Sequence, residues 1–190
     1  MFIATSLDGY IAREDGTFDF LDPFAGHEHG YTAFFASIDA LVIGRGTYDT
    51  VLGFPEWPYA GKRVVVMTRR PAEARHGETF VAGTPLEVLE VLDGCKHVYV
   101  DGGAVIRQFL AWHVLDDLTI SIIPIVLGGG IRLFDEGEGE HKLELIGSQS
   151  YANGLVQVRY QTIPDERAEA PARRTAGSHP PPAPNRTRRT

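Results

Sequence analysis

Apolar residues in this chain fall into short runs that stop abruptly at glycine or at a basic turn. Three of these runs predict buried strands, because they are short and two of them are rich in β-branched residues. They are Ala40–Ile43 before Gly44-Arg45-Gly46-Thr47, Val64–Met67 before Thr68-Arg69-Arg70, and His97–Val100 before Asp101-Gly102-Gly103. Ligands of open α/β sheets bind beyond the carboxyl ends of the strands, so the three turns predict a binding site.

Helical periodicity occurs between these runs. Apolar side chains recur at helical spacing over His27–Ser37 and again after Gly103, which predicts two amphipathic helices. The clearest helix start is Thr84-Pro85-Leu86-Glu87, where threonine caps, proline suits the first turn and glutamate completes a capping box. The stretch Arg13–Gly26 is too polar and too rich in glycine for a helix, so we expect a loop there.

Strands that alternate with helices predict an α/β fold with a mostly parallel sheet. Phe2–Leu7 and Leu118–Val126 are two further strands of this pattern. Near the end, Leu143–Ala152 and Leu155–Ile163 flank Asn153-Gly154, a strong hairpin signal. The predicted sheet is therefore mixed, with an antiparallel C-terminal hairpin.

Composition divides the chain into a body and a tail. Residues 1–163 are predicted to form one domain, whereas residues 164–190 are rich in Pro, Ala and Arg and are predicted to be disordered. The formal net charge is −7, and the tail is its basic part, so the body is acidic. An acidic body argues against general nucleic-acid binding.

Cysteine and apolar content exclude other classes. A single cysteine, Cys95, allows no internal disulfide and no cysteine-rich metal site, which suits a reducing cytoplasm. No apolar run reaches 18 residues, so no membrane association is predicted. His27 and His29 lack the i, i+4 spacing of a helical zinc pair, and no metal site is predicted.

The glycine turns carry the chemistry of phosphate binding. A helix that starts just after glycine presents free N–H groups and a partial positive charge to an anion. Arginine adds a planar fork that donates two hydrogen bonds to one phosphate. An NAD site would place a carboxylate near the ribose, whereas the loop here reads Thr68-Arg69-Arg70, which favours NADPH. The alternatives are solvated surface charges for the arginines and a plain tight turn for Gly102-Gly103.

Four motifs in this order resemble those of one known family: Ser6–Ala12 (SLDGYIA), Val42–Tyr48 (VIGRGTY), Val100–Gly103 (VDGG) and Pro124–Gly130 (PIVLGGG). The chain is similar to the dihydrofolate-reductase-like superfamily. Within it, the chain resembles the reductase domain at the C-terminus of the bifunctional riboflavin-biosynthesis deaminase/reductase. The resemblance covers about residues 1–163 and implies a three-layer α/β/α fold, NADPH as cofactor and a homodimer.

The resemblance also implies where NADPH lies. Ala4 and Ile11 match positions that wall the nicotinamide ring. Gly44, Arg45 and Thr47 match the helix start that holds the adenosine side and the pyrophosphate. Thr68, Arg69 and Arg70 match the loop that meets the 2′-phosphate. The other pyrophosphate-binding helix start matches Gly102, Gly103, Ala104, Val105 and Ile106.

Reduction of a C=N bond needs a hydride, which the cofactor supplies, and a proton, which the protein must manage. A carboxylate in an apolar pocket is the usual proton handler, because burial raises its pKa. The resemblance places Glu28 at the position of the substrate-binding acid on the first helix and Asp101 at a substrate-contacting position. The alternatives are a favourable helix-dipole charge for Glu28 and a helix cap for Asp101.

The substrate implied is a flat heterocycle, pterin-like or of the pyrimidine type. Aromatic residues near the predicted mouth suit such a ring, although they could equally form a core or a dimer interface: Phe18, Phe20, Tyr31, Trp57 and Tyr59. Gly128-Gly129-Gly130 either shapes this mouth or ends a strand.

The expected activity resembles that of 5-amino-6-(5-phosphoribosylamino)uracil reductase. The predicted first helix and the stretch Tyr48–Ala60 nevertheless lack the arginines that would bind a ribosyl phosphate. Dihydrofolate reductase and a catalytically silent NADPH-binding protein are the alternatives.

Overall fold

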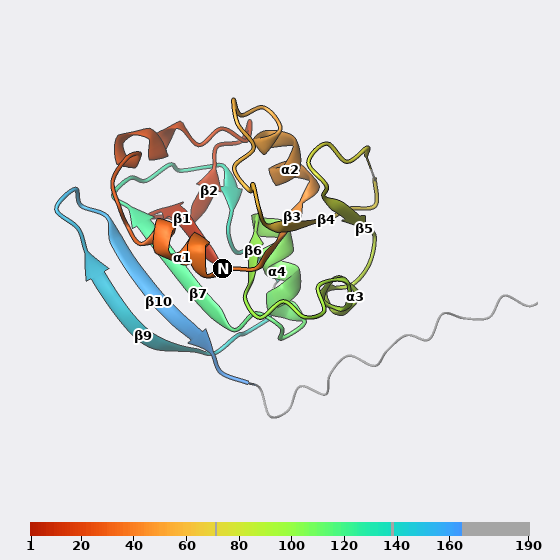
Figure 1. Ribbon diagram of the computed structural model, residues 1–190. Coiled ribbons are helices and arrows are strands. Elements are labelled where there is room, and N and C mark those ends of the chain that lie inside the picture. Colours follow the sequence, from red (N-terminus) through yellow and green to blue (C-terminus); the bar gives the residue numbers. More distant parts are fainter. Residues whose placement is uncertain (71, 138, 165–190) are drawn as a thin grey trace, which may run out of the picture.

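A computed structural model of the chain describes residues 1–70, 72–137 and 139–164 (Figure 1). The strands are β1 (Phe2–Ser6), β2 (Tyr10–Ala12), β3 (Ala40–Gly44), β4 (Arg63–Met67), β5 (Thr79–Val81), β6 (Val98–Asp101), β7 (Asp117–Ile123), β8 (Ile131–Arg132), β9 (Leu143–Ser150) and β10 (Val156–Thr162). The helices are α1 (Tyr31–Ser37), α2 (Arg45–Val51), α3 (Pro85–Val91), α4 (Gly103–Ala111) and a 3₁₀ helix, η1 (Asp19–Phe24). The tail predicted for residues 164–190 lies outside the described residues, apart from Pro164.

Eight of the strands form two four-stranded sheets that lie side by side, and β2 and β8 form a separate antiparallel pair. One has the order β5-β4-β3-β6 and is parallel throughout. The other has the order β1-β7-β10-β9, in which β1 and β7 are parallel and β10 and β9 add an antiparallel hairpin. β1 lies next to β6, and the Tyr99 hydroxyl on β6 donates to the Phe2 carbonyl on β1 at 2.8 Å. The mixed, mostly parallel arrangement predicted from the sequence is confirmed.

Helices cover both faces of the parallel sheet, which makes three layers. Successive strand residues point to opposite faces, and on β3 both sets are fully buried. Leu41 and Ile43 pack toward α1 and α2, whereas Ala40 and Val42 pack toward α3 and α4. This double burial explains why the strand sequences are continuously apolar rather than alternating.

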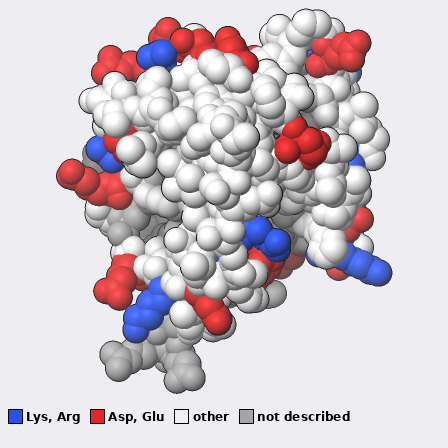
Figure 2. Space-filling model, turned by 90° about the vertical axis from the view of Figure 1, so that its left-hand side faces the viewer, with Lys and Arg blue, Asp and Glu red and all other residues white. Residues whose placement is uncertain are grey.

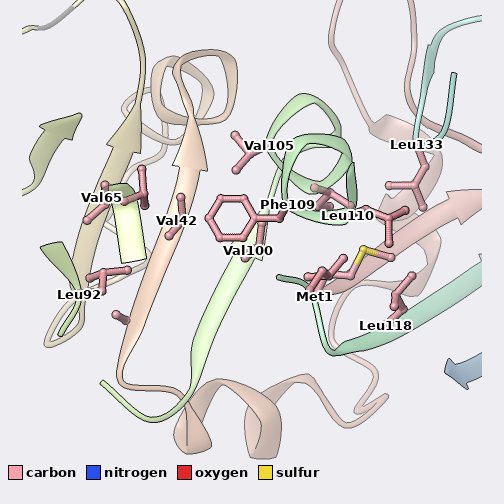
Figure 3. Close-up of a cluster of buried hydrophobic side chains, with 14 residues drawn as sticks. Met1, Val42, Val65, Leu92, Val100, Val105, Phe109, Leu110, Leu118 and Leu133 are labelled. Carbon is pink, nitrogen blue, oxygen red and sulfur yellow. The ribbon is translucent and has the colours of Figure 1, made fainter. Parts of the chain in front are cut away.

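Phe109 lies at the centre of the larger core. Its ring is fully buried and projects from α4 toward β3 and β6, beside Val42 and Val100 (Figure 3). The same cluster reaches Leu118 at the start of β7, so one core joins the two sheets. A buried aromatic ring of this size dominates the local packing energy.

The structure differs from the sequence prediction at several boundaries. The helix predicted from His27 is wrong at its start, because α1 begins at Tyr31 after Gly30, whose φ of +86° places it outside the helix. Within the predicted loop Arg13–Gly26, a 3₁₀ helix forms over Asp19–Phe24. The predicted strand Leu118–Val126 ends at Ile123. Short strands β2 and β8 were not predicted.

The capping box predicted at Thr84 is present, since the Thr84 hydroxyl accepts the Glu87 amide and the Glu87 carboxylate accepts the Thr84 amide at 2.7 Å. We expect Thr84→Ala to lower the free energy of unfolding by about 1 kcal/mol, because the α3 start loses its cap. Thr84→Ser keeps the hydroxyl and should change stability little. Urea unfolding followed by circular dichroism measures both variants, and equal stability of the two would contradict a capping role.

The β9–β10 hairpin forms one side of the molecule, at the left in Figure 1. That side faces the viewer in Figure 2, where a broad central area carries few charged side chains. Several apolar side chains of the hairpin are exposed: Leu145, Ile146 and Val156. The homodimer stays a prediction. Among the described residues, no helix is long and apolar enough to cross a membrane.

Candidate functional site

The turns that follow β6, β3 and β4 lie side by side at the carboxyl edge of the parallel sheet. Ile43 on β3 pairs with Asp101 on β6, and Gly44 pairs with Met67 on β4. The strand register therefore places Gly102, Arg45 and Thr68 next to one another, although they are far apart in the sequence. This is the edge at which such sheets bind ligands.

Two of these turns touch where Gly102 meets α2. Gly102 has a φ of +88°, and a Cβ built there would lie 2.5 Å from Thr47 Oγ1. A Cβ on Gly103 would lie 2.9 Å from Ile11 Cδ1, and one on Gly44 would lie 3.1 Å from Val105 Cγ2. The absence of side chains at these glycines thus allows two helix starts and β2 to come together. The predicted residues Ile11, Gly44, Thr47, Gly103 and Val105 belong to this one cluster.

The starts of α2 and α4 are not capped by any side chain, in contrast to α3. At α4, Val105 and Ile106 amides both donate to the Gly102 carbonyl, at 3.0 and 2.9 Å. The amides of Gly103 and Ala104 precede these bonds at the helix start, where N–H groups have no partner within the helix. Uncapped amides next to glycine are suited to hold an anion.

An arginine loop borders this cluster. Thr68 Oγ1 accepts the Arg70 amide at 3.0 Å, and Arg45 Nη1 donates to the Arg70 carbonyl at 2.9 Å. Arg45 Nε also pairs with Asp49, one helical turn further on, at 2.8 Å. Arg69 and Arg70 are exposed and make no ion pair with the residues that the structure describes. The structure thus brings together all three parts of the predicted phosphate site.

Ala4 lies in a different environment from Ile11. It packs with the buried cluster of Phe20, Ile123 and Leu155, under η1 and beside the hairpin. Ile11 packs against Gly103 and the main core. The two residues predicted to wall the nicotinamide therefore lie against separate hydrophobic clusters.

Glu28 lies ahead of α1 rather than on it and is exposed to solvent. Its Oε1 accepts the Gly30 amide at 2.6 Å. Hydrogen bonding, chiefly with Thr32, lowers the pKa of Glu28. A carboxylate of lowered pKa stays ionised near neutral pH and is a poor proton donor. The geometry favours the helix-start alternative for this residue over the catalytic one.

Asp101 has the opposite environment. Its side chain lies on the same face of β6 as Tyr99, toward α1, and burial raises the pKa of Asp101 although the Gly102 amide lowers it in part. Partial burial and the nearby Asp101 carboxylate raise the pKa of Tyr31 to about 12. Asp101 thus directly precedes the glycine turn, its charge acts on Tyr31 at the start of α1, and it is the described acid best placed to carry a proton near neutral pH.

Asp8 joins the β1–β2 turn to the glycine run that follows β7. Its carboxylate accepts the Ser6 hydroxyl at 2.6 Å and the Leu127 and Gly128 amides at 3.1 and 2.7 Å. These bonds lower the pKa of Asp8 to about 2. Gly130, with a φ of +137°, packs so closely on the Ala12 carbonyl that no side chain fits there. Since β7 already ends at Ile123, the glycine run does not end that strand. It packs on the β1–β2 turn and on the end of β2.

The predicted aromatic mouth is mostly core. Phe20 and Tyr59 are buried, and the Trp57 ring packs on Tyr48 and Tyr59. Tyr31 keeps 42 % of its surface exposed beside Asp101. Of the five predicted aromatic residues, Tyr31 is the one that combines exposure with proximity to the acid.

Two hollows lie elsewhere on the described part of the chain. A cavity of about 440 Å³ opens at the amino ends of β6 and β7, lined by Val98, Asp117 and Phe109, and contains none of the predicted site residues. A more open hollow of about 530 Å³ lies between residues 13–15 and residues 127–129, beside Asp8. We place the site at the carboxyl edge, because the uncapped amides and unpaired arginines gather there.

Known proteins resemble this chain in sequence and in fold. The RibD C-terminal domain matches residues 1–157. The chain belongs to the RibD C-terminal domain family. Two Bacillus subtilis (strain 168) proteins are similar: YwjB is 36% identical over 166 residues, covering 84% of this chain and 95% of YwjB, and YyaP is 27% identical over 175 residues, covering 83% and 91%. Both alignments cover nearly the whole length of the relative, so the similarity concerns the entire domain.

Solved structures show the same fold. A protein from Shewanella sp. PV-4 that is provisionally assigned to riboflavin biosynthesis is 36% identical, with a TM-score of 0.79 over 86% of this chain and 97% of that one. A pyrimidine reductase-like protein from Corynebacterium diphtheriae is 18% identical, with a TM-score of 0.61 over 86% and 91%. The Thermotoga maritima deaminase/reductase is 16% identical, with a TM-score of 0.64 over 85% of this chain and 55% of that protein. The last two show the fold alone.

Proposed function

We propose that this chain is an NADPH-dependent reductase of a flat heterocycle of the pterin or pyrimidine type. The observation that carries the proposal is the contact between two uncapped glycine turns, at Gly44 and Gly102, directly beside the arginine loop. Backbone amides of this kind bind pyrophosphate, and arginine side chains bind a 2′-phosphate. The pyrimidine reductase-like and uracil reductase names of the structural relatives support this substrate class.

The residues present fit a dinucleotide. Gly102 and Gly103 contribute no side chain to this turn, so the starts of α2 and α4 lie close enough together to offer backbone amides to one pyrophosphate. Arg69 and Arg70 are exposed within the neighbouring loop and are suited to bind the 2′-phosphate. When bound, NADPH supplies the hydride that reduces a C=N bond of the substrate.

Asp101 would hold the proton that the substrate nitrogen needs. Its raised pKa keeps a larger fraction of the carboxyl protonated near neutral pH than for an exposed aspartate. Tyr31, exposed beside it, would stack on the heterocycle and keep it over the acid. Glu28 has neither the burial nor the raised pKa for this task, so the structure provides no support for the dihydrofolate reductase alternative.

Replacing both Arg69 and Arg70 by alanine should weaken NADPH binding about 10- to 100-fold, because charge-assisted hydrogen bonds to the 2′-phosphate are lost. NADH lacks that phosphate, so its affinity should change less than about threefold. Fluorescence titration of each nucleotide measures both affinities, and Arg159→Ala, an exposed arginine on β10, is the matched control.

Three outcomes separate the possibilities. Unchanged NADPH affinity in the double variant would remove the arginine loop from the site. Equal and weak binding of both nucleotides by the wild-type protein would contradict the cofactor proposal itself. Tight NADPH binding with no oxidation across a panel of pterins and pyrimidines would favour a silent nucleotide-binding protein.

A further inference from the structure

Glu78 is a buried carboxylate that the proposed reaction does not use. Only 5 % of its surface is exposed, and it receives hydrogen bonds from the Tyr48 hydroxyl and from the Arg75 and His76 amides, the last two at 2.8 and 2.7 Å. Burial acts to raise the pKa of Glu78, but these bonds outweigh it and lower the pKa to about 2. Glu78 is therefore a buried anion whose donors come from two separate parts of the chain.

Two hydrogen bonds from α2 hold the ends of the loop that joins β4 to β5. At the loop start, Arg45 donates to the Arg70 carbonyl at 2.9 Å, and at the loop end Tyr48 donates to Glu78. Arg45 and Tyr48 are three residues apart on α2, so they lie on one side of the helix. The His76 ring also stacks on Trp57, with centroids 4.4 Å apart. The loop thus follows the helix whose start forms part of the candidate phosphate site.

The loop carries three exposed arginines, Arg69, Arg70 and Arg75, and no ion pair ties any of them to another described residue. Their positions relative to Gly44 depend on how the loop is held, because their own side chains make no ion-pair anchor. Tyr48 is only 1 % exposed and packs in the hydrophobic cluster that contains Leu41 and Ile43, so it cannot shift easily. Because Tyr48 is fixed in this cluster, its hydrogen bond to Glu78 also fixes the end of the loop that carries the arginines.

We propose that Glu78, through Tyr48, is a positioning residue that sets the preference of the site for a 2′-phosphorylated nucleotide. This inference rests on the proposed function. A loop whose backbone is already held binds the 2′-phosphate without the cost of ordering that backbone. NADH has no 2′-phosphate for the arginines to bind, so a looser loop should lower the affinity for NADPH more than the affinity for NADH.

Two conservative variants test the coupling. Glu78→Gln keeps the shape but turns an amide NH₂ group toward donors that need an acceptor, so we expect NADPH affinity to fall about tenfold and NADH affinity to change less than about twofold. Tyr48→Phe keeps the ring in the core and removes one donor, so the same change should be smaller, about threefold. Glu56→Gln, an exposed carboxylate on the preceding loop, is the matched control.

Trypsin provides a measurement without nucleotide. It can cleave after Arg69 and Arg75, whereas Pro71 protects the bond after Arg70. We expect Glu78→Gln to accelerate these two cleavages at least about fivefold, because local opening of the loop exposes its backbone. Far-UV circular dichroism and thermal unfolding confirm that each variant is folded before it is compared.

The results separate this inference from the proposed function. A lower NADPH/NADH affinity ratio in both folded variants, with faster cleavage in Glu78→Gln, supports it. A wild-type protein that prefers NADPH, with variants that keep its ratio or lose both nucleotides equally, overturns the inference and leaves the proposed function standing. A wild-type protein without preference for NADPH overturns both, and unchanged cleavage in Glu78→Gln then shows that the loop does not depend on this anchor.

Discussion

Asp101→Asn is expected to lower turnover by about two to four orders of magnitude, the usual contribution of a positioned proton donor, while NADPH affinity changes little. Asparagine keeps the size of the side chain and can still accept the Gly102 amide, but it cannot deliver a proton to the substrate nitrogen. Steady-state rates with a heterocyclic substrate and NADPH titration measure the two effects separately. Asp93→Asn, at an exposed acid after α3, should leave both unchanged.

The same substitution should stabilise the fold near neutral pH. Burial raises the pKa of Asp101 above its ordinary value of 3.8, so the folded state binds the proton more tightly than the unfolded state. The stability that this residue contributes is therefore complete below pH 3.8 and is lost as pH rises through the raised pKa. Asparagine does not ionise, so the stability advantage of Asp101→Asn over wild type should grow from low pH toward pH 8.

Urea unfolding at several pH values between about 3 and 8 measures this difference. Loss of activity together with a gain in stability would show that burying the Asp101 carboxyl lowers the stability of the fold and that the reaction needs the carboxyl there. Loss of both at all pH values would instead make Asp101 a structural cap, which is the alternative inferred from the sequence. A variant as active as wild type would exclude it as the proton donor.

The order of elements could be predicted from the sequence because each element depends on local pattern. The runs around Val42, Val65 and Val100 are buried on both faces, so their apolar character is continuous and easy to recognise. Thr84 and Glu87 form the capping box that their spacing predicts. The predicted start of this helix at His27 is too early, because the apolar spacing begins only at Tyr31 and does not fix where the helix starts; Gly30, in the left-handed conformation, directly precedes the first helical residue.

The candidate site could be predicted on its cofactor side and not on its substrate side. Glycines after strands mark the phosphate turns directly, and parallel register then brings Gly44 and Gly102 together. The acids are different, because their chemistry depends on burial that only the tertiary structure creates. Sequence position made Glu28 and Asp101 equal candidates, whereas the environment lowers the pKa of the first and raises that of the second.

Contacts between distant segments account for the remaining features. Asp8 meets Gly128 across 120 positions of sequence, and Tyr48 meets Glu78 across 30. Glu78 has no local motif that distinguishes it from a surface carboxylate, and the Ser6–Ala12 motif around Asp8 does not say which segment Asp8 contacts. A buried polar group needs a partner, but one sequence does not say which segment provides it.

Gly102→Ala is expected to lower the affinity for NADPH by more than about 100-fold, because the new methyl group collides with Thr47 and displaces the turn whose amides would hold the pyrophosphate. It should also lower the free energy of unfolding by about 2–4 kcal/mol. Part of this loss comes from the φ of +88°, which costs an L-residue about 1–2 kcal/mol. The remainder comes from crowding against Thr47 Oγ1, only 2.5 Å from the added Cβ.

Gly61→Ala separates these two costs, since Gly61 has a φ of +78° but open space around its Cβ position. It should lose about 1–2 kcal/mol of stability and retain NADPH affinity. In the double variant Gly102→Ala/Thr47→Ala the crowding is relieved, so stability should partly recover, while nucleotide binding stays weak because Thr47 itself belongs to the candidate site. NADPH binding of wild-type strength in any folded Gly102→Ala protein would mean that the pyrophosphate is not held at this turn, and the site would then have to be sought away from the paired helix starts.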